Sequence, residues 1–348
     1  MKAGIVGLPN VGKSTLFKAL TKHPVDINNY PFCTIEPNIG IVEVPDERLH
    51  RLTELSGSAK TVPAVVEFSD IAGLVKGASE GEGLGNQFLA NIRETDAIIQ
   101  VVRVFESGDI THVHESVDPA RDIDIINTEL ILADLETVIR RKEKLVKELR
   151  AGRKGAEEEN VWLSALESVL EAGQLANAAD LPGDPGDAAR FVRSLGLLTS
   201  KPFLYVYNMT ETDASLPPEL ASLPHVRLDV KLESELSEMT AEEAAELGLA
   251  SRIGELIREA YSLLGLMTFF TTGEAESRAW TIPQGSTAPR AGAAIHGDFE
   301  EKFIRAEVVS YDDLISAGSW SAARDAGTLR LEGKEYIVRD GDVIVFRI

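Results

Sequence analysis

The sequence predicts an α/β fold that carries a helical insertion and ends in a small α+β domain. Three observations indicate this. A glycine-rich motif lies between a strand pattern and a helix pattern at the start of the chain, and short apolar runs alternate with helical patterns through the first third. Near Gly265 the pattern changes to short strands separated by glycine-rich turns. Strand–helix alternation is typical of a sheet with helices on both faces, and 348 residues allow about two domains.

The elements of the α/β part follow from apolar runs and their periodicity. The expected strands are Ala3–Gly7, Ile39–Val44, Val62–Phe68, Ala97–Phe105, Pro202–Asn208 and His225–Leu232. The expected helices are Lys13–Lys22, Asn86–Arg93 and Ile253–Leu264.

A helical hairpin is expected in the middle of the chain, at about residues 121–185. The stretch Ile123–Arg150 contains neither proline nor glycine, and its apolar residues recur every three or four positions. After a glycine-containing turn at 151–155, Leu163, Leu166 and Leu170 form a second seam. The two helices should pack antiparallel, because neither apolar stripe can remain exposed to water. Asn177–Gly186, rich in Asp, Pro and Gly, is expected to be a loop before the strands of the α/β domain resume.

The C-terminal domain is expected to span residues 265–348 and the α/β domain residues 1–264. Within the smaller domain, Ala279–Ile282 and Ile304–Val309 read as strands. Tyr336–Ile348 reads as a closing hairpin around Arg339–Asp342.

Charge and composition exclude several classes of protein. The 56 acidic and 35 basic residues give a net charge of −21, which disfavours general attraction to nucleic acid or to anionic membranes. The charge is segregated, however, because residues 140–154 hold eight basic and two acidic side chains. The single cysteine, Cys33, excludes an intrachain disulfide and fits a reducing, cytoplasmic compartment. No apolar run approaches the roughly 18 residues of a membrane helix.

The first eight-residue motif predicts a phosphate-binding loop. Gly7–Ser14 reads GLPNVGKS and matches G-x-x-x-x-G-K-[ST] in full, between a predicted strand and a predicted helix. Its glycines let backbone N–H groups turn toward phosphates, and the helix N-terminus favours anions. Lys13 would place its charge on the β- and γ-phosphates, and the Ser14 hydroxyl would bind Mg²⁺.

A second motif supplies the expected partner of that metal. Asp70–Gly73, at the end of a predicted strand, has the D-x-x-G form of GTPase-like proteins, in which the Asp supports Mg²⁺ and the Gly N–H meets the γ-phosphate. Thr34 is spaced to bring a hydroxyl to the same ion. Leu74 occupies the place where Ras-type enzymes carry a glutamine that orients water, so hydrolysis requires another group.

Base recognition also departs from the GTPase pattern. The strand Pro202–Asn208 ends in Asn208-Met209-Thr210-Glu211, where GTPases have N-K-x-D. The longer glutamate cannot reproduce the bidentate contact with guanine, and an asparagine suits the amino group and N7 of adenine. We therefore expect the preference for guanine to weaken.

Taken together, these motifs resemble the YchF / Obg-like ATPase family. DIAGLVKGASEGEGLG at 70–85, NQFLANIRET at 86–95 and RAWTIP at 278–283 add to the resemblance, which covers nearly the whole chain. It implies a Ras-like P-loop NTPase domain with an inserted coiled-coil hairpin, followed by a ubiquitin-like β-grasp TGS domain. It also implies a translation-factor-type ATPase that prefers ATP over GTP, associates with ribosomes and regulates translation or a stress response.

The resemblance also implies roles for individual residues. The nucleotide-binding residues would be Asn10, Val11, Gly12, Lys13, Ser14, Thr15, Asn208, Met209 and Glu211. Mg²⁺ would be bound by Ser14, Thr34 and Asp70, and Asn10 resembles an asparagine that holds K⁺ in related enzymes. The catalytic residues would be His112, Lys13 and Gly73, with His114 as the alternative to His112 for positioning water.

Other interpretations remain open at this stage. The chain could be an Obg-type GTPase in ribosome assembly, or a nucleotide-gated switch with negligible turnover. Residues 140–154 fit either an RNA contact or a solvated helix face with i,i+4 pairs. The C-terminal domain, with nine basic and thirteen acidic residues, is not a broad phosphate-binding face, but it could dock protein or touch RNA through Lys302 and Arg305. Neither a membrane nor sequence-specific DNA is expected as a partner.

Overall fold

The computed structural model describes residues 1–22, 25, 30, 38–71, 83–105, 117–210 and 212–348. By internal contacts these residues form two compact units. One contains residues 1–22, 38–40 and 68–253 and is called the P-loop unit; the other contains residues 25, 30, 41–67 and 254–348 and is called the C-terminal unit. The C-terminal unit thus includes a segment from the first fifth of the chain, which the sequence patterns did not reveal.

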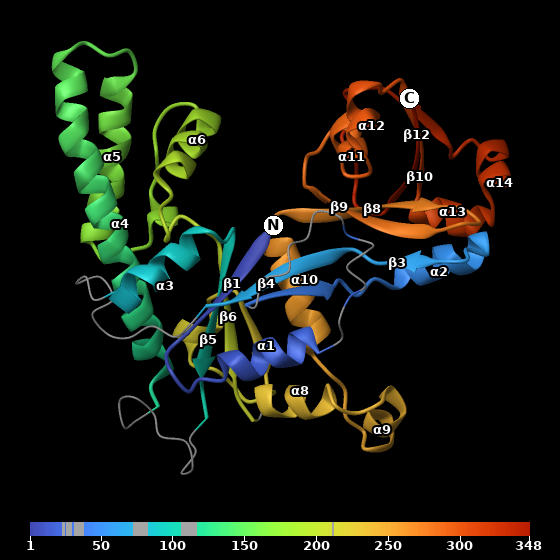
Figure 1. Cartoon of the computed structure of the whole chain (residues 1–348), viewed down its shortest axis with the longest axis horizontal. Helices are drawn as coiled ribbons and strands as arrows, with labels where there is room; N and C mark the ends of the chain where they lie inside the picture. Colours follow the sequence, from blue (N-terminus) through green and yellow to red (C-terminus); the bar gives the residue numbers. More distant parts are fainter. Residues whose placement is uncertain (23–24, 26–29, 31–37, 72–82, 106–116, 211) are drawn as a thin grey trace. The chain divides into compact units, whose positions relative to one another are not determined.

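The first six-stranded sheet has the order β2-β4-β1-β5-β6-β7 (Figure 1). Its strands are β1 (Lys2–Val6), β2 (Ile39–Glu43), β4 (Val65–Asp70), β5 (Ala97–Arg103), β6 (Phe203–Asn208) and β7 (His225–Leu228). The pairs β1–β5, β5–β6 and β6–β7 are parallel, and every residue of β5 is buried. The predicted α/β class is confirmed.

Two of the expected strands differ from the prediction. Val62–Phe68 is two strands, because Pro63 has no N–H to donate and interrupts the ladder; β3 (Thr61–Val62) joins one sheet and β4 the other. His225–Leu232 ends as a strand at Leu228, because Asp229 accepts hydrogen bonds from Lys231 N and Leu232 N and caps helix α8 (Val230–Leu236).

The other helices of the P-loop unit outside the insertion are short. They are α1 (Lys13–Thr21), α3 (Gly83–Arg93), α7 (Pro218–Ala221) and α9 (Ala241–Glu246). None of the helices within the described ranges is both long and apolar enough to cross a membrane.

The insertion between β5 and β6 is an antiparallel helical hairpin, drawn in green in Figure 1. Helices α4 (Pro119–Arg150) and α5 (Ala156–Glu171) bury the predicted seam, which includes Val138, Leu145, Leu163 and Leu166. The prediction of a loop over Asn177–Gly186 is wrong for its last two residues, which are helical. Asp184 caps a further helix, α6 (Pro185–Leu195), whose Phe191 ring lies 5.2 Å from that of Trp162.

The base of the hairpin is fixed by a buried carboxylate. Asp134 of α4 accepts hydrogen bonds from Leu198 N (2.8 Å), Thr199 N (2.7 Å) and Thr199 Oγ1 (2.6 Å). Burial raises the pKa of Asp134, and the Thr199 hydrogen bonds oppose that rise. Since residues 198–199 lead into β6, this contact joins the hairpin to the central sheet.

The C-terminal unit has a second six-stranded sheet, of order β11-β10-β12-β8-β9-β3. Besides β3, its strands are β8 (Leu266–Thr272), β9 (Ser277–Pro283), β10 (Arg305–Ser310), β11 (Arg330–Glu332) and β12 (Asp342–Arg347). Its helices are α2 (Glu47–Ser56), α10 (Ile253–Leu263), α11 (Ala288–Ala293), α12 (Gly297–Glu301), α13 (Tyr311–Ala317) and α14 (Trp320–Asp325). Phe269, Ile282, Val308 and Ile344 belong to the core on one face of this sheet.

The expected closing hairpin at 336–348 is wrong. Strand β12 pairs antiparallel with β10 and parallel with β8 instead. The Asp342 carboxylate accepts hydrogen bonds from Tyr336 Oη (2.7 Å) and Arg339 N (2.8 Å), which holds the preceding segment as a turn. Ile337 bridges to Thr287, away from β12.

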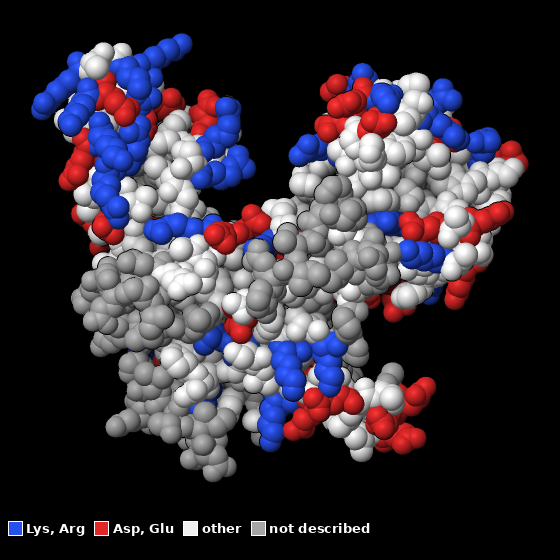
Figure 2. Space-filling model, in the orientation of Figure 1, with Lys and Arg blue, Asp and Glu red and all other residues white. Residues whose placement is uncertain are grey.

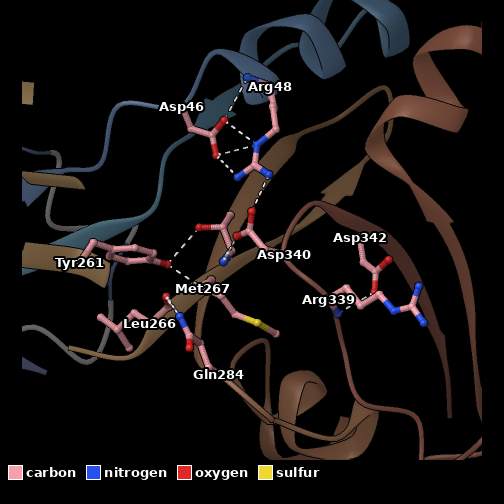
Figure 3. Close-up of polar contacts among 10 residues, drawn as sticks. Asp46, Arg48, Tyr261, Leu266, Met267, Gln284, Arg339, Asp340 and Asp342 are labelled. Atoms are coloured by element: carbon pink, nitrogen blue, oxygen red, sulfur yellow. Dashed lines mark hydrogen bonds and ion pairs between the residues drawn. The ribbon is translucent and has the colours of Figure 1, made fainter. Parts of the chain in front are cut away.

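An arginine explains why the early segment belongs to the C-terminal unit (Figure 3). Arg48 of α2 donates to Asp46 (2.7 Å) and to Asp340 Oδ2 (2.7 Å), and Asp340 Oδ1 accepts from Thr268 N (2.9 Å). The Arg48 guanidinium also lies 5.2 Å from the Phe270 ring centre. A hydrogen-bonded, partly buried ion pair therefore ties α2 to the loop before β12.

Candidate nucleotide-binding site

Two glycines of the P-loop, Gly7 and Gly12, stand where neighbouring atoms leave no room for a side chain, and Gly12 also has a positive φ. A Cβ on Gly7 would lie 2.7 Å from Val101 O, and Gly12, with φ 106°, has Asn208 Nδ2 2.8 Å from the place of its absent Cβ. Asn10 also adopts a left-handed φ of 63°. The loop is thus wrapped tightly between β1 and α1, and its peptide groups follow the path that phosphate binding needs.

Lys13, the first residue of α1, is largely buried. Its ammonium donates to Leu8 O at 2.7 Å, across the loop. Burial lowers the pKa of Lys13 to about 8, while the nearby Asp70 carboxylate opposes that shift. Burial therefore makes the charged form of Lys13 costly, and a bound polyphosphate would offset that cost by attracting the ammonium group.

The fold brings together Ser14 of α1 and Asp70 at the end of β4, which are 56 residues apart in the sequence. Ser14 Oγ donates to Asp70 Oδ2 at 3.3 Å, and Asp70 ends β4 beside β1, with Ile71 N donating to Ile5 O at 3.1 Å. Asp70 Oδ1 is buried and has no hydrogen-bond partner among the described residues. Hydroxyl and carboxylate oxygens are the ligands Mg²⁺ prefers, so the orphaned oxygen beside the Ser14 hydroxyl fits such an ion.

Asn208 connects the base-recognition strand to the P-loop. Its Nδ2 donates to Val11 O (2.9 Å) and its Oδ1 accepts from Val230 N (3.1 Å). The amide thus holds the P-loop against the start of α8, which leaves one N–H and one lone pair for other contacts. Met209, also predicted to contact the base, is buried at the end of β6.

The structure places only part of the predicted site. Asn10 and Thr15 are exposed in the P-loop and the first turn of α1, and Val11 is buried. Six residues with predicted roles or alternatives lie outside the described residues: Thr34, Gly73, Leu74, His112, His114 and Glu211. Their roles stay predictions.

The sequence did not reveal the structural role of one lysine in the P-loop unit, Lys201. Lys201 donates to the carbonyl oxygens of Ile92 (2.7 Å), Arg93 (2.9 Å) and Thr95, and so caps the C-terminus of α3. Burial lowers the pKa of Lys201, against the opposing effect of Asp96. Lys201 directly precedes the predicted strand Pro202–Asn208 and is more than 100 residues away from α3 in the sequence. No local pattern therefore indicated that it caps that helix.

Known proteins are similar to this chain along its whole length. A family model described as "50S ribosome-binding GTPase" matches residues 2–158, and the YchF-type GTPase C-terminal model, described as a protein of unknown function, matches residues 266–348. The chain is 50% identical to the ribosome-binding ATPase YchF of Bacillus subtilis, with 100% of the chain and 99% of that protein covered. The chain belongs to the YchF family.

Other YchF proteins agree along the full length. The ribosome-binding ATPase YchF of Pasteurella multocida is 48% identical, over 99% of the chain and 98% of that protein. The solved structure of the Schizosaccharomyces pombe YchF GTPase is 38% identical and superposes with a TM-score of 0.87, covering 100% of this chain and 97% of that one. The YchF resemblance inferred from the sequence motifs is therefore confirmed, as is the fold it implied.

Proposed function

We propose that the chain is a cytoplasmic, ribosome-associated ATPase that hydrolyses ATP with Mg²⁺ and regulates translation or a stress response. The observation that carries the proposal is the convergence of Lys13, Ser14 and the orphaned Asp70 oxygen on the P-loop. The names of the B. subtilis and P. multocida relatives, both ribosome-binding ATPases, support it.

The P-loop binds the triphosphate. Its backbone N–H groups and the N-terminus of α1 receive the phosphate oxygens, and Lys13 places its charge on the β- and γ-phosphates. Ser14 and Asp70, together with Thr34, would hold the Mg²⁺ ion. When bound, the ion neutralises charge that develops on the phosphate oxygens.

Hydrolysis needs a group to position water, because leucine stands at position 74. His112 takes this role in the proposal, with His114 as the alternative, and the Gly73 N–H meets the γ-phosphate. Asn10 would hold a K⁺ ion that supplements the positive charge at the transferred group. Replacing His112 with alanine should abolish turnover and leave ATP affinity intact; unchanged turnover would remove His112 from the mechanism.

Adenine recognition is assigned to the end of β6. Asn208 fixes the P-loop and offers its remaining N–H, Met209 packs against the base, and Glu211 contacts its edge. The lost N-K-x-D pattern is the reason to expect ATP over GTP.

The ribosome contact is assigned to the tip of the hairpin, where Lys and Arg gather at the upper left of Figure 2. Of the eight basic residues at 140–154, four are in ion pairs with hairpin carboxylates: Arg140, Arg141, Lys142 and Arg153. Within the described chain, Lys144, Lys147, Arg150 and Lys154 make no such pair and are exposed. These four are suited to the phosphates of ribosomal RNA.

Two measurements on the purified chain test the proposal. In equilibrium competition ATP should displace a fluorescent nucleotide at lower concentration than GTP; tighter GTP binding would favour the Obg-type GTPase, a reading that the description of the N-terminal family model also suggests. In co-sedimentation the chain should bind ribosomes in a nucleotide-dependent way. Absence of binding under every nucleotide would contradict ribosome association.

A further inference from the structure

Two arginines of the C-terminal unit contact one largely buried carboxylate, and a third adds to the positive charge around it. Glu307 of β10 is largely buried and accepts from Arg347 Nε at 3.0 Å. Arg324, from helix α14, brings its Nη2 to 3.6 Å from the other oxygen. Arg305 adds to the positive field, and together these guanidinium groups keep the pKa of Glu307 below its usual value, with the Arg347 hydrogen bond as the largest cause.

Strand register places these groups on one face of the sheet. Arg305 pairs with Arg347 across β10 and β12, and Glu307 pairs with Leu331 across β10 and β11. Residues two apart on a strand share a face, so the two arginines, Glu307 and Leu331 lie together, and Arg324 reaches them from α14. We call this set of five residues the arginine face.

The arginine face is open to solvent. Leu331 is 66% exposed, and the side chains of Arg324 and Arg347 are 64% and 51% exposed. Figure 2 shows Lys and Arg gathered over this part of the C-terminal unit, between the C-terminus and α14 as labelled in Figure 1. Both the charge and the apolar side chain can therefore meet a partner.

Neutralising Glu307 does not account for the whole cluster. Three arginines and one glutamate give the five residues of the arginine face a formal charge of +2. Ion pairs whose arginine lies at the surface contribute little to the stability of a fold, so stability alone gives little reason to gather these arginines. A buried carboxylate that fixes several guanidinium groups does, however, pre-orient their planar N–H forks toward an incoming anion.

The surroundings decide between two kinds of anion. Residues 265–348 carry thirteen acidic and nine basic groups, so a long polyanion such as RNA would meet repulsion beyond the cluster. A short segment can place its carboxylates on the arginines alone. Leu331 adds an apolar contact that a sugar-phosphate backbone cannot use but an aliphatic side chain can.

We infer that the arginine face docks a short acidic segment of a partner protein, in which an aliphatic residue lies beside the carboxylates. The paired carboxylates meet Arg305, Arg324 and Arg347, and the aliphatic residue covers Leu331. This inference goes beyond the proposed ATPase, because none of the five residues belongs to the nucleotide-binding site or to the hairpin.

Fluorescence anisotropy with the full-length chain tests the inference. The probe is a fluorescein-labelled peptide of sequence Gly-Glu-Glu-Leu-Asp-Glu-Leu-Gly, compared with the same peptide carrying serine in place of leucine and with labelled oligouridylate of equal length. The leucine peptide should bind most tightly. The R324Q/R347Q double variant should lose about tenfold in affinity for it, and Leu331→Ser should lose severalfold.

Controls separate docking from loss of structure. Arg290→Gln removes an arginine of similar exposure from α11 in the same unit and should leave peptide affinity unchanged. Leu331→Ser alters only an exposed side chain, so its effect cannot come from unfolding of the core. Absence of peptide binding, equal affinity in the double variant, or tighter binding of the RNA would each overturn the inference. Nucleotide and ribosome binding, measured in parallel, report on the proposed function separately.

Discussion

The P-loop and the hairpin tip are both cationic, but they are built in opposite ways. At the P-loop one lysine, largely buried, donates to a backbone carbonyl next to backbone N–H groups held by glycines. At the tip eight basic side chains lie on the last turns of α4 and in the turn that follows it, and four of them make no ion pair within the described chain. A buried charge with fixed neighbours selects one anion of defined shape, whereas an exposed array responds to charge density.

The difference also sets how each region responds to salt. Interactions between exposed charges weaken as the Debye length falls to about 8 Å at physiological ionic strength, and buried charges are screened much less. ATP affinity should therefore depend weakly on salt, while ribosome affinity should fall steeply.

The largest effect is expected from Lys13→Met. The change removes the charge that meets the phosphates, and charge-assisted hydrogen bonds contribute about 1.5–3 kcal/mol each, so ATP affinity should fall about 100-fold or more. Isothermal titration calorimetry measures it. Lys18→Met, which removes an exposed lysine from the same helix, is the control and should bind ATP as the parent does. Retained affinity in Lys13→Met would contradict the assigned phosphate contact.

The next largest effect is expected from reversing the unpaired charges of the tip. Glutamate at positions 144, 147, 150 and 154 should weaken ribosome co-sedimentation about 30-fold. It should also reduce the slope of log affinity against log salt by about 3, because each phosphate contact contributes roughly 0.7–0.9. ATP affinity should not change.

A second variant with the same net charge distinguishes a local contact at the tip from a general effect of the chain's net charge on ribosome binding. Glutamate at Lys18, Arg190, Lys231 and Arg290 reverses four exposed basic residues elsewhere. This variant should keep most of its ribosome affinity and its salt slope. Equal losses in the two variants would mean that the tip has no special role.

A smaller effect is expected from pH, and it concerns the P-loop alone. Burial lowers the pKa of Lys13 to about 8, and the phosphates favour its protonated form. Nucleotide affinity should therefore be full below pH 8 and fall as pH rises, by about tenfold between pH 7 and 9. Lys13→Arg keeps its charge throughout this range, so its affinity, even if lower, should change little with pH. An unchanged profile in the parent chain would contradict a buried, titrating Lys13.

The smallest effect is expected from a paired tip residue. Arg141 is held by Glu148 at 2.8 Å and by Glu159 at 2.5 Å, so it is already neutralised within the hairpin. Arg141→Gln should change ribosome affinity by less than about twofold, whereas Lys147→Gln should lower it several-fold. If the two single variants lose equally, pairing within the hairpin does not determine which side chains contact RNA.

Much of the fold could be predicted because the decisive signals are local. The GLPNVGKS motif between a strand and a helix specifies its own geometry, and the buried seam of α4 and α5 follows from apolar spacing. What was missed depends on contacts between distant segments. Arg48 meets Asp340 almost 300 positions later, so no window along the chain reveals that α2 belongs to the C-terminal unit.

The predicted site divides in the same way. Lys13, Ser14 and Asp70 were expected from their motifs and are found together. The role of Asn208 in base recognition stays a prediction, but its amide binds Val11 O and Val230 N, which only the folded chain shows. The turn before β12 failed as a hairpin prediction because Asp342 uses its carboxylate to hold Tyr336 and Arg339. A side chain that hydrogen-bonds to nearby backbone groups can hold a turn where the residue pattern favours the paired strands of a hairpin.

The measurement that tests the account most directly is ATP turnover with and without ribosomes, in the parent chain and in the variant with glutamate at 144, 147, 150 and 154. We expect ribosomes to raise turnover in the parent chain, and the variant to keep the basal rate and lose most of the stimulation. A basal rate that ribosomes leave unchanged in the parent, or full stimulation in the variant, would contradict it.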